Sequence, residues 1–263
     1  MHRHDRDRFV TALFAAPERR EALFALYAFN YEVARIREAV SEPILGSIRL
    51  QWWREVVEAA AKGEPPRQHE VAAPLAAAIG DYHLDGELFN RMLDAREADL
   101  TGERPATLQA LEQYAAATGG NLAALALQIL GAGEAAEAGR HMGTGYALAG
   151  LLRASAFHAR SGRGFIPAEL DPKHSVLNLK PAPELAEAAR AIANAARINL
   201  EKARALKDKV PRQGIAALLL AVLAEHWLRR LDQSDYDLFS PRLAAPDPWR
   251  SLRLWRAARA GRF

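Results

Sequence analysis

The chain has 263 residues, of which half are apolar and a quarter charged, a composition typical of ordinary globular proteins. Its formal net charge of +3 is small, and its pI of about 9.3 reflects arginines that are concentrated above all in Arg250–Phe263. Because there is no cysteine, disulfides, thiolate nucleophiles, thiolate zinc sites and iron–sulfur ligation are excluded.

The start of the chain, MHRHDRDRFV, carries charges with no apolar run behind them, so it does not resemble a secretory signal or a transit peptide. The most apolar run, Ile215–Ala224, has about ten residues, whereas a helix that spans a bilayer needs roughly 20. We therefore expect a cytoplasmic protein and leave contact with a membrane surface open.

The apolar residues recur with helical spacing along nearly the whole chain. Pro17 is placed to open a first helix, and the apolar stripe on that helix continues to Val40 through Leu26, Phe29, Val33 and Ile36. A second helix is expected from an N-cap at Ser41, with Pro43 in its first turn, to Gly63. Further helices are expected around residues 69–80, 85–100, 107–130, 134–160, 183–209, 212–232 and 247–260. Alternating β-branched runs are absent, so the pattern predicts an all-α fold.

One long irregular stretch, Ser161–Pro183, separates two helical regions of similar composition. It could link two domains, but we interpret it as a long loop inside a single domain that covers residues 1–263. Long loops in compact domains are frequently functional.

Four segments, in order, resemble the squalene and phytoene synthase family, whose members join prenyl diphosphates head to head. They are REALFALYAFNYEVARIRE (20–38), LEQYAAATGGNLAALALQILG (111–131), GYALAGLLRASAFHARSGRGFIP (145–167) and HWLRRLDQSDYDLFSPRL (226–243). The resemblance implies the fold of the isoprenoid synthases, a helical bundle with a central cavity.

In active members of that family, two helices each carry aspartates four residues apart. Positions i and i+4 share one helix face, so two carboxylates there can bind Mg²⁺, which prefers oxygen ligands. The metal ions then withdraw charge as diphosphate leaves.

The matching positions in this chain have lost most of those carboxylates. The first pair falls on Ala34 (or Arg35) and Glu38, and the second falls on Ala154 and His158. One of four expected carboxylates remains, so we predict no metal site and no confident catalytic residue.

A narrower resemblance points to the branch of this family that contains the mitochondrial complex I assembly factor six. The strings AFNYEVARIREAVSEPILGSIRLQWWRE and LLRASAFHARSGRGFIP carry it, together with LDAREADL at residues 93–100. The resemblance implies a helper in building NADH:ubiquinone oxidoreductase at the inner membrane.

Arginines gather on the two helices that should face each other across the cavity. Two interpretations stay open: solvated or salt-bridged surface arginines, or a metal-free anion pocket in which guanidinium groups bind phosphate. His158 is similarly either a hydrogen-bonded structural residue or a cavity group that titrates near neutral pH. The residues of the hypothetical pocket are Tyr27, Asn30, Arg35, Arg37, Arg153, His158, Arg160 and Arg163.

Three other features have a structural and a functional interpretation. DYHLD (81–85) reproduces the acid spacing, but we expect a loop in which Asp85 caps a helix. LDAREADL is either a polar helix face or a cavity contact. Trp52 and Trp53 point about 100° apart on a helix, so one is expected in the core while the other is free to bind a partner.

The C-terminal helix predicted at about 247–260 is basic and amphipathic. Trp249, Leu252 and Trp255 lie on one side, and Arg250, Arg253, Arg256 and Arg259 on another. Such a helix either lies on anionic lipid or a partner protein, through Trp249, Arg253, Trp255 and Arg256, or packs onto the bundle.

The leading hypothesis is a catalytically inactive relative of the synthases that assists assembly of respiratory complex I, with complex I subunits or assembly intermediates as partners. The cavity either binds a prenyl, lipid or anionic ligand or is a relic, and no cofactor is expected. One alternative is an active Mg²⁺-dependent head-to-head prenyltransferase, and another is a lipid-binding module of the same fold with no assembly role. We expect a location at the inner membrane face (the matrix side for a processed eukaryotic form) and no nucleic-acid partner, because the basic tail is too local.

Overall fold

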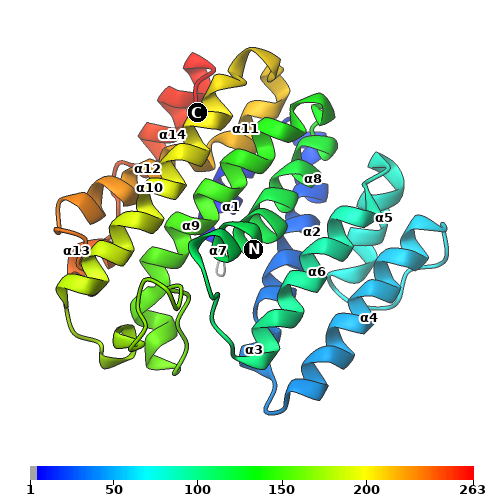
Figure 1. Ribbon diagram of the computed structural model, residues 1–263. Coiled ribbons are helices and arrows are strands. Elements are labelled where there is room, and N and C mark those ends of the chain that lie inside the picture. Colours follow the sequence, from blue (N-terminus) through cyan, green and yellow to red (C-terminus); the bar gives the residue numbers. More distant parts are fainter. Residues whose placement is uncertain (1–4) are drawn as a thin grey trace.

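Helices account for every regular element in residues 5–263, the part of the chain that the computed structural model describes (Figure 1). The expectation of an all-α fold is therefore confirmed. The α-helices are α1 (Arg6–Ala12), α2 (Pro17–Ala34), α3 (Ile36–Ala39), α4 (Pro43–Ala61), α5 (Ala72–Tyr82), α6 (Gly86–Thr101), α7 (Leu108–Ala115), α8 (Asn121–Ile129), α9 (Ala136–Arg160), α10 (Pro183–Ala205), α11 (Ile215–Leu218), α12 (Leu220–Asp232), α13 (Pro241–Ala244) and α14 (Arg250–Ala260). A π-helical turn, η1 (Ala116–Gly120), joins α7 to α8.

Helix α9 runs through the middle of the bundle and packs against α8, α10 and α12 (Figure 1). On the other side, α2, α4, α5 and α6 pack on one another, and α8 connects the two halves by contacting both α2 and α9. The buried apolar side chains form one continuous cluster across these helices. Burial of this cluster is the main force that holds the bundle together.

The backbones of η1 and α9 approach closely at two glycines. A Cβ atom added to Gly143 of α9 would overlap the carbonyl oxygen of Gly119 in η1, and one added to Gly119 would overlap the carbonyl of Gly143. Glycine is required here because no side chain fits between the two backbones.

The first expected helix is interrupted. It ends at Ala34, because Arg35 has φ −96° and ψ −1°, and a separate turn, α3, follows. The predicted apolar stripe is nevertheless buried as a whole, from Leu26 through Ile36 to Val40. The interruption therefore reorients the chain without exposing its apolar face.

The predicted N-cap at Ser41 is wrong. Helix α4 starts one residue later than such a cap requires: Glu42 occupies the cap position in an extended conformation, Pro43 is the first helical residue, and no side chain caps the helix. Proline tolerates this because its missing N–H is one that the first turn leaves unpaired anyway.

The expected loop at residues 81–85 is shorter than predicted, since Asp81 and Tyr82 form the last turn of α5. The second half of that prediction is confirmed: the Asp85 side chain accepts a hydrogen bond from the Glu87 N–H at 2.9 Å and caps α6. Helices α1 and α13 were not expected, because each is too short to show a periodic pattern.

The loop between α9 and α10 is fixed to the bundle by a buried acid. Both carboxylate oxygens of Asp171 accept backbone N–H bonds, from Ser175 at 2.7 Å and Val176 at 3.0 Å. Arg104, before α7, donates to the carbonyl oxygen of Asp171. The loop is therefore held over the α6–α7 connection.

Within residues 5–263, no helix is both long enough and apolar enough to cross a lipid bilayer.

Candidate functional site

A cavity of about 610 Å³ opens between α2, α6, η1 and α9. The N-terminal helix α1 and side chains from α12 and α14 close one side of it. Its polar and aromatic lining comprises Asp5, Arg6, Asp7, Arg8, Asn30, Tyr31, Arg35, Glu38, Arg96, Asp99, Tyr114, Thr118, Tyr146, Arg153, His158, Arg163, Phe165, Trp227 and Arg250. Among the described residues of the lining, seven arginines therefore face four carboxylates, which gives these residues a net positive charge.

The structure brings the four degenerate positions together. Ala34 lies at the end of α2 and Glu38 in α3, while Ala154 and His158 lie one turn apart on α9, and all four line the cavity. The two helix faces that the sequence comparison placed opposite each other therefore do share one cavity.

Glu38, the remaining carboxylate, is held in an ion pair with an arginine. Its Oε1 lies 2.5 Å from Nη2 of Arg163, in the loop after α9. The guanidinium charge offsets that of Glu38, so this lone carboxylate supplies no excess negative charge for a divalent metal ion.

His158 lies half-buried beside Phe165, with ring centroids 4.9 Å apart. Burial, together with the positive charge of Arg163 and against the opposing effect of Glu38, lowers the pKa of His158 to about 4. The imidazole is therefore neutral at pH 7, and its buried Nδ1 has no hydrogen-bond partner. A neutral nitrogen donor is a poor ligand for Mg²⁺, which prefers oxygen.

The donor set consequently does not fit the Mg²⁺ ions that this fold implies. Two of the four positions offer methyl groups, one offers a neutral imidazole and one an ion-paired carboxylate. Among residues 5–263, no group of three or more His, Cys, Asp or Glu side chains is arranged to hold a metal ion.

One buried cation on α1 was not anticipated from the sequence. Arg8 forms an ion pair with Asp5 at 2.6 Å and lies over the rings of Tyr146 at 5.0 Å and Tyr27 at 5.9 Å. Burial alone would lower the pKa of Arg8, but the Asp5 carboxylate raises it above its ordinary value. Its Nε is buried without a partner, so Arg8 has an unused donor.

A second buried cation lies on α6. Nη1 of Arg96 is 2.5 Å from the Tyr114 hydroxyl and 3.2 Å from Asp99, and that hydroxyl donates to Asp99 at 2.9 Å. Its Nε is also buried and unpaired. Burial raises the pKa of Tyr114, so its hydroxyl stays protonated. This triad keeps one positive charge at the cavity wall.

The segment LDAREADL contributes residues both to the cavity and to a polar outer helix face. Arg96 and Asp99 face the cavity, whereas Asp94 and Glu97 lie on the outer side, where both contact Arg54 of α4, at 2.7 and 3.2 Å. The mixture of acids and arginine in the sequence indicated a polar segment. Which of these side chains face the cavity depends on how the helix is rotated in the bundle.

Of the eight predicted pocket residues, five line the cavity: Asn30, Arg35, Arg153, His158 and Arg163. Tyr27 is buried behind Arg8. Arg37 and Arg160 are not part of the lining: Arg37 is half-buried in α3 with a buried Nε, and Arg160 is exposed on the last turn of α9. Arg8, Arg96 and Arg250 take their place.

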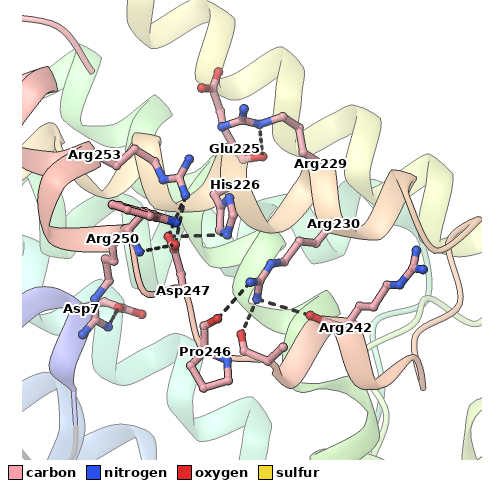
Figure 2. A network of polar contacts seen from close by, with 12 residues as sticks. Asp7, Glu225, His226, Arg229, Arg230, Arg242, Pro246, Asp247, Arg250 and Arg253 are labelled. Carbon is pink, nitrogen blue, oxygen red and sulfur yellow. Dashed lines mark hydrogen bonds and ion pairs between the residues drawn. The ribbon is translucent and has the colours of Figure 1, made fainter.

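The C-terminal helix is fixed by polar contacts on its inner side (Figure 2). Asp247 accepts hydrogen bonds from Arg253 at 3.0 and 3.1 Å, and Arg250 reaches Asp7 of α1 at 2.7 Å. Arg230 of α12 donates to the carbonyl oxygens of the residues just before α14, including Pro246 at 3.1 Å.

This orientation turns Leu254 into the core and leaves three large apolar side chains outside. Trp249 is 65% exposed and Trp255 50%, with Leu252 beside them. Arg256 is exposed and Arg259 lies over the Trp255 ring at 5.5 Å, whereas Arg253 is committed to Asp247.

The family model for squalene/phytoene synthase matches residues 1–250. The chain belongs to the squalene/phytoene synthase family.

Curated relatives within this family include "NADH dehydrogenase (ubiquinone) complex I, assembly factor 6" from Bos taurus and from Homo sapiens. The bovine protein is 30% identical over 97% of this chain and 78% of its own length. The human protein is 30% identical over 92% of this chain and 75% of its own length.

Among solved structures, a dehydrosqualene synthase in complex with ligand superposes with a TM-score of 0.81. It covers 98% of this chain and 93% of its own, at 15% sequence identity. The predicted isoprenoid-synthase fold is thus confirmed, and the likeness at this identity concerns the fold alone.

Proposed function

We propose that this chain is a catalytically silent member of the squalene/phytoene synthase family that assists the assembly of respiratory complex I. The observation that carries the proposal is the combination of a retained cavity with a donor set unsuited to Mg²⁺. Ala34 and Ala154 present methyl groups where the family's chemistry requires carboxylates. Similarity over 92–97% of this chain to relatives named for complex I assembly supports the role.

The test has an enzymatic and a cellular arm. Purified protein is incubated with Mg²⁺ or Mn²⁺ and farnesyl or geranylgeranyl diphosphate, and pyrophosphate release is measured; we expect none above a matched blank. Cells of the host organism that lack the gene should lose assembled complex I and its NADH:ubiquinone activity, and the wild-type gene should restore both. Turnover would refute catalytic silence, and normal complex I would refute the assembly role.

An active Mg²⁺-dependent prenyltransferase has less support from the geometry. It needs replacement ligands near Glu38, but Asp94 lies outside the cavity against Arg54 and Glu32 lines a separate groove. The other acids in the cavity are engaged by arginine, as Asp7 is by Arg250 and Asp99 by Arg96.

We further propose that the cavity binds an anionic ligand, such as a prenyl or lipid phosphate, without a metal ion. The excess of arginine over carboxylate and the unpaired Nε donors of Arg8 and Arg96 support this. Guanidinium groups hold phosphate oxygens in paired hydrogen bonds. Farnesyl diphosphate should therefore raise the unfolding temperature equally in EDTA and in Mg²⁺, whereas stabilisation that requires Mg²⁺ would refute metal-free binding.

The outer face of α14 is the proposed membrane contact. Trp249, Leu252 and Trp255 offer apolar area, and Arg256 supplies charge for anionic lipid. Binding to vesicles of phosphatidylglycerol and phosphatidylcholine should fall roughly thirtyfold in a Trp249→Ser/Trp255→Ser variant, because two aromatic rings at about 1 kcal/mol each contribute about 2 kcal/mol. Equal vesicle binding by the variant and the wild type would show that the membrane contact does not lie on this face of α14.

A further inference from the structure

A second concave surface lies on the outside of the bundle, between α2, α3, α4 and the segment that precedes α5. We call it the α4 groove; its volume is about 400 Å³, and it is lined by Glu32, Arg35, Ile36, Arg49, Trp52 and His69, among others. Helix α4 lies at the edge of the molecule, with α3 beside its first turns (Figure 1). The degenerate acid positions Ala34 and Ala154 are not part of its lining.

The groove is preformed by packed aromatic rings. Trp53 is buried in the core and Trp52 is half-buried, with ring centroids 4.8 Å apart. His69 packs against both, at 5.2 and 5.6 Å, and its Nδ1 accepts the N–H groups of Val71 and Ala72 at the start of α5. The walls are therefore rigid, so binding there costs little conformational entropy.

An apolar ridge leads into the groove from the start of α4. Ile44 is 61% exposed and Ile48 60%, with Leu45 beside them. Residues four apart share a helix face, so Ile48 stands one turn before Trp52. The opposite side of this turn is covered, because Gly46 packs directly against Leu100 of α6. An exposed apolar ridge that continues into a pocket marks an interaction surface.

The charges beside the ridge indicate what binds. Arg35 and Arg49 line the groove, and neither forms an ion pair with a described carboxylate; Arg35 lies over the Tyr31 ring at 5.2 Å. Glu32 is the one acidic side chain in the lining. A partner that supplies carboxylates opposite these two guanidinium groups would complement the surface.

We propose that the α4 groove and its ridge are a docking site for an acidic, apolar segment of another protein. An apolar side chain of that segment enters the groove and packs against the wall that Trp52 and His69 form. Further apolar residues cover Ile44 and Ile48, and a carboxylate meets Arg49. This site shares Arg35 with the cavity but has its own opening and lining, and it does not depend on complex I being the partner.

Other occupants fit less well. A small molecule in the groove would leave Ile44 and Ile48 in water. A flat lipid surface would not fill a concave pocket, and it would place Glu32 and Glu42 against anionic head groups. A second copy of this chain, in a two-fold contact, would bring the same arginines face to face.

Site-specific photo-crosslinking tests the proposal with the full-length protein in its host cells. Benzoylphenylalanine replaces Ile48, and the same replacement at Ile198, which is 50% exposed on α10, serves as the matched control. We expect Ile48, but not the control, to crosslink to one protein segment that carries apolar residues and carboxylates. Mass spectrometry identifies the segment.

Charge reversal then tests the role of the arginine. Arg49→Glu should lower the crosslinking yield about tenfold, and changing the contacted carboxylate to lysine should restore it. Arg212→Glu, at an exposed arginine beside α11, should leave the yield unchanged. Circular dichroism of each variant checks that it folds.

The remaining outcomes overturn the proposal. Crosslinks only to lipid assign the ridge to a membrane, and crosslinks only to the same chain assign it to self-association. A crosslinking yield at Ile48 that is no higher than at Ile198 would show that no partner docks at the ridge. A yield that Arg49→Glu does not change would show that the partner is not recognised through an acidic group. Complex I content is measured in the same cells, so failure of the docking site is distinguished from failure of the assembly role.

Discussion

Two side chains that face each other across the cavity define its chemistry at the residue scale. His158 remains neutral at pH 7, and Glu38 is held by Arg163. One has no hydrogen-bond partner for its buried nitrogen, while the other has a strong one. Neither arrangement offers a free carboxylate to a metal ion.

The titration of His158 gives the first prediction. Its pKa is about 4 in the folded protein and 6.5 in an unfolded chain, so unfolded molecules take up the proton first as the pH falls. The stability that this difference provides is complete above pH 6.5 and is lost as the pH falls through 4. Urea denaturation should therefore show a smaller loss of stability between pH 7 and pH 4.5 in His158→Gln than in the wild type. Equal losses would contradict the low pKa.

Glu38 gives a prediction whose sign separates the two functional hypotheses. Glu38→Gln removes the carboxylate that occupies Arg163 and frees that guanidinium for an anion. Metal-free binding predicts that the affinity for farnesyl diphosphate in EDTA rises, by about tenfold for one additional charge-assisted contact. If Glu38 were a metal ligand instead, the variant would bind more weakly and only the wild type would respond to Mg²⁺. Calorimetric titration with and without Mg²⁺ decides between them.

At the element scale, the contact between η1 and α9 determines how tightly the cavity wall is built. Gly119 belongs to the cavity lining, and it lies against Gly143 with no room for a side chain. The π-helical turn supplies this close approach, and such turns are frequent at functional sites.

Gly143→Ala should lower the free energy of unfolding by about 3 kcal/mol, the upper end of the cost of overpacking, since backbone atoms rather than a flexible side chain must move. Gly150→Ala, on the same helix, is the control. A Cβ atom there meets nothing within 4 Å, so this change should stabilise the protein by roughly 0.5–1 kcal/mol. Chemical denaturation of both variants measures the difference, and a similar effect at both positions would contradict the close contact.

Sequence periodicity predicted most of the elements because burial follows helical spacing. It placed α6, α9 and α10 within a few residues, and the apolar stripe from Leu26 to Val40 is buried as expected. It missed the break at Arg35, where no glycine or proline marks the end of the helix. A break of this kind depends on tertiary packing, which one segment alone does not reveal.

Only part of the cavity lining was predictable, because the sequence shows local motifs but not which distant segments come together. Ala34, Ala154 and His158 were found because they replace residues at known spacing in family motifs. Arg8 and Arg250 were missed as cavity residues, since they come from segments far apart in the sequence and line one cavity only in the folded bundle. No local pattern brings residues at positions 8 and 250 together.

At the scale of the whole molecule, Asp7 joins three distant segments. It contacts Arg250 of α14 at 2.7 Å and Arg153 of α9 at 3.8 Å, and it is itself buried in α1. The ends of the chain therefore close one side of the cavity through a single carboxylate.

Asp7→Asn should destabilise the protein by about 2 kcal/mol, because it leaves the Arg250 guanidinium without its charged partner in a poorly hydrated site. Hydrogen exchange should rise in α1 and α14 together and remain unchanged in α5, which lies on the other side of the bundle. Exchange that rises in only one of the two terminal helices would show that they are not joined through Asp7. The control Asp81→Asn, at an exposed acid on α5, should change nothing.

Arg35 lines both the cavity and the α4 groove. Its single positive charge serves both sides, so an anion bound in the cavity and a carboxylate docked in the groove would repel each other and weaken each other's binding. By linkage, the factor by which a cavity ligand weakens docking equals the factor by which docking weakens that ligand. A protein built this way would hold an anionic ligand in the cavity while the groove is empty, and docking of a partner in the groove would favour release of that ligand.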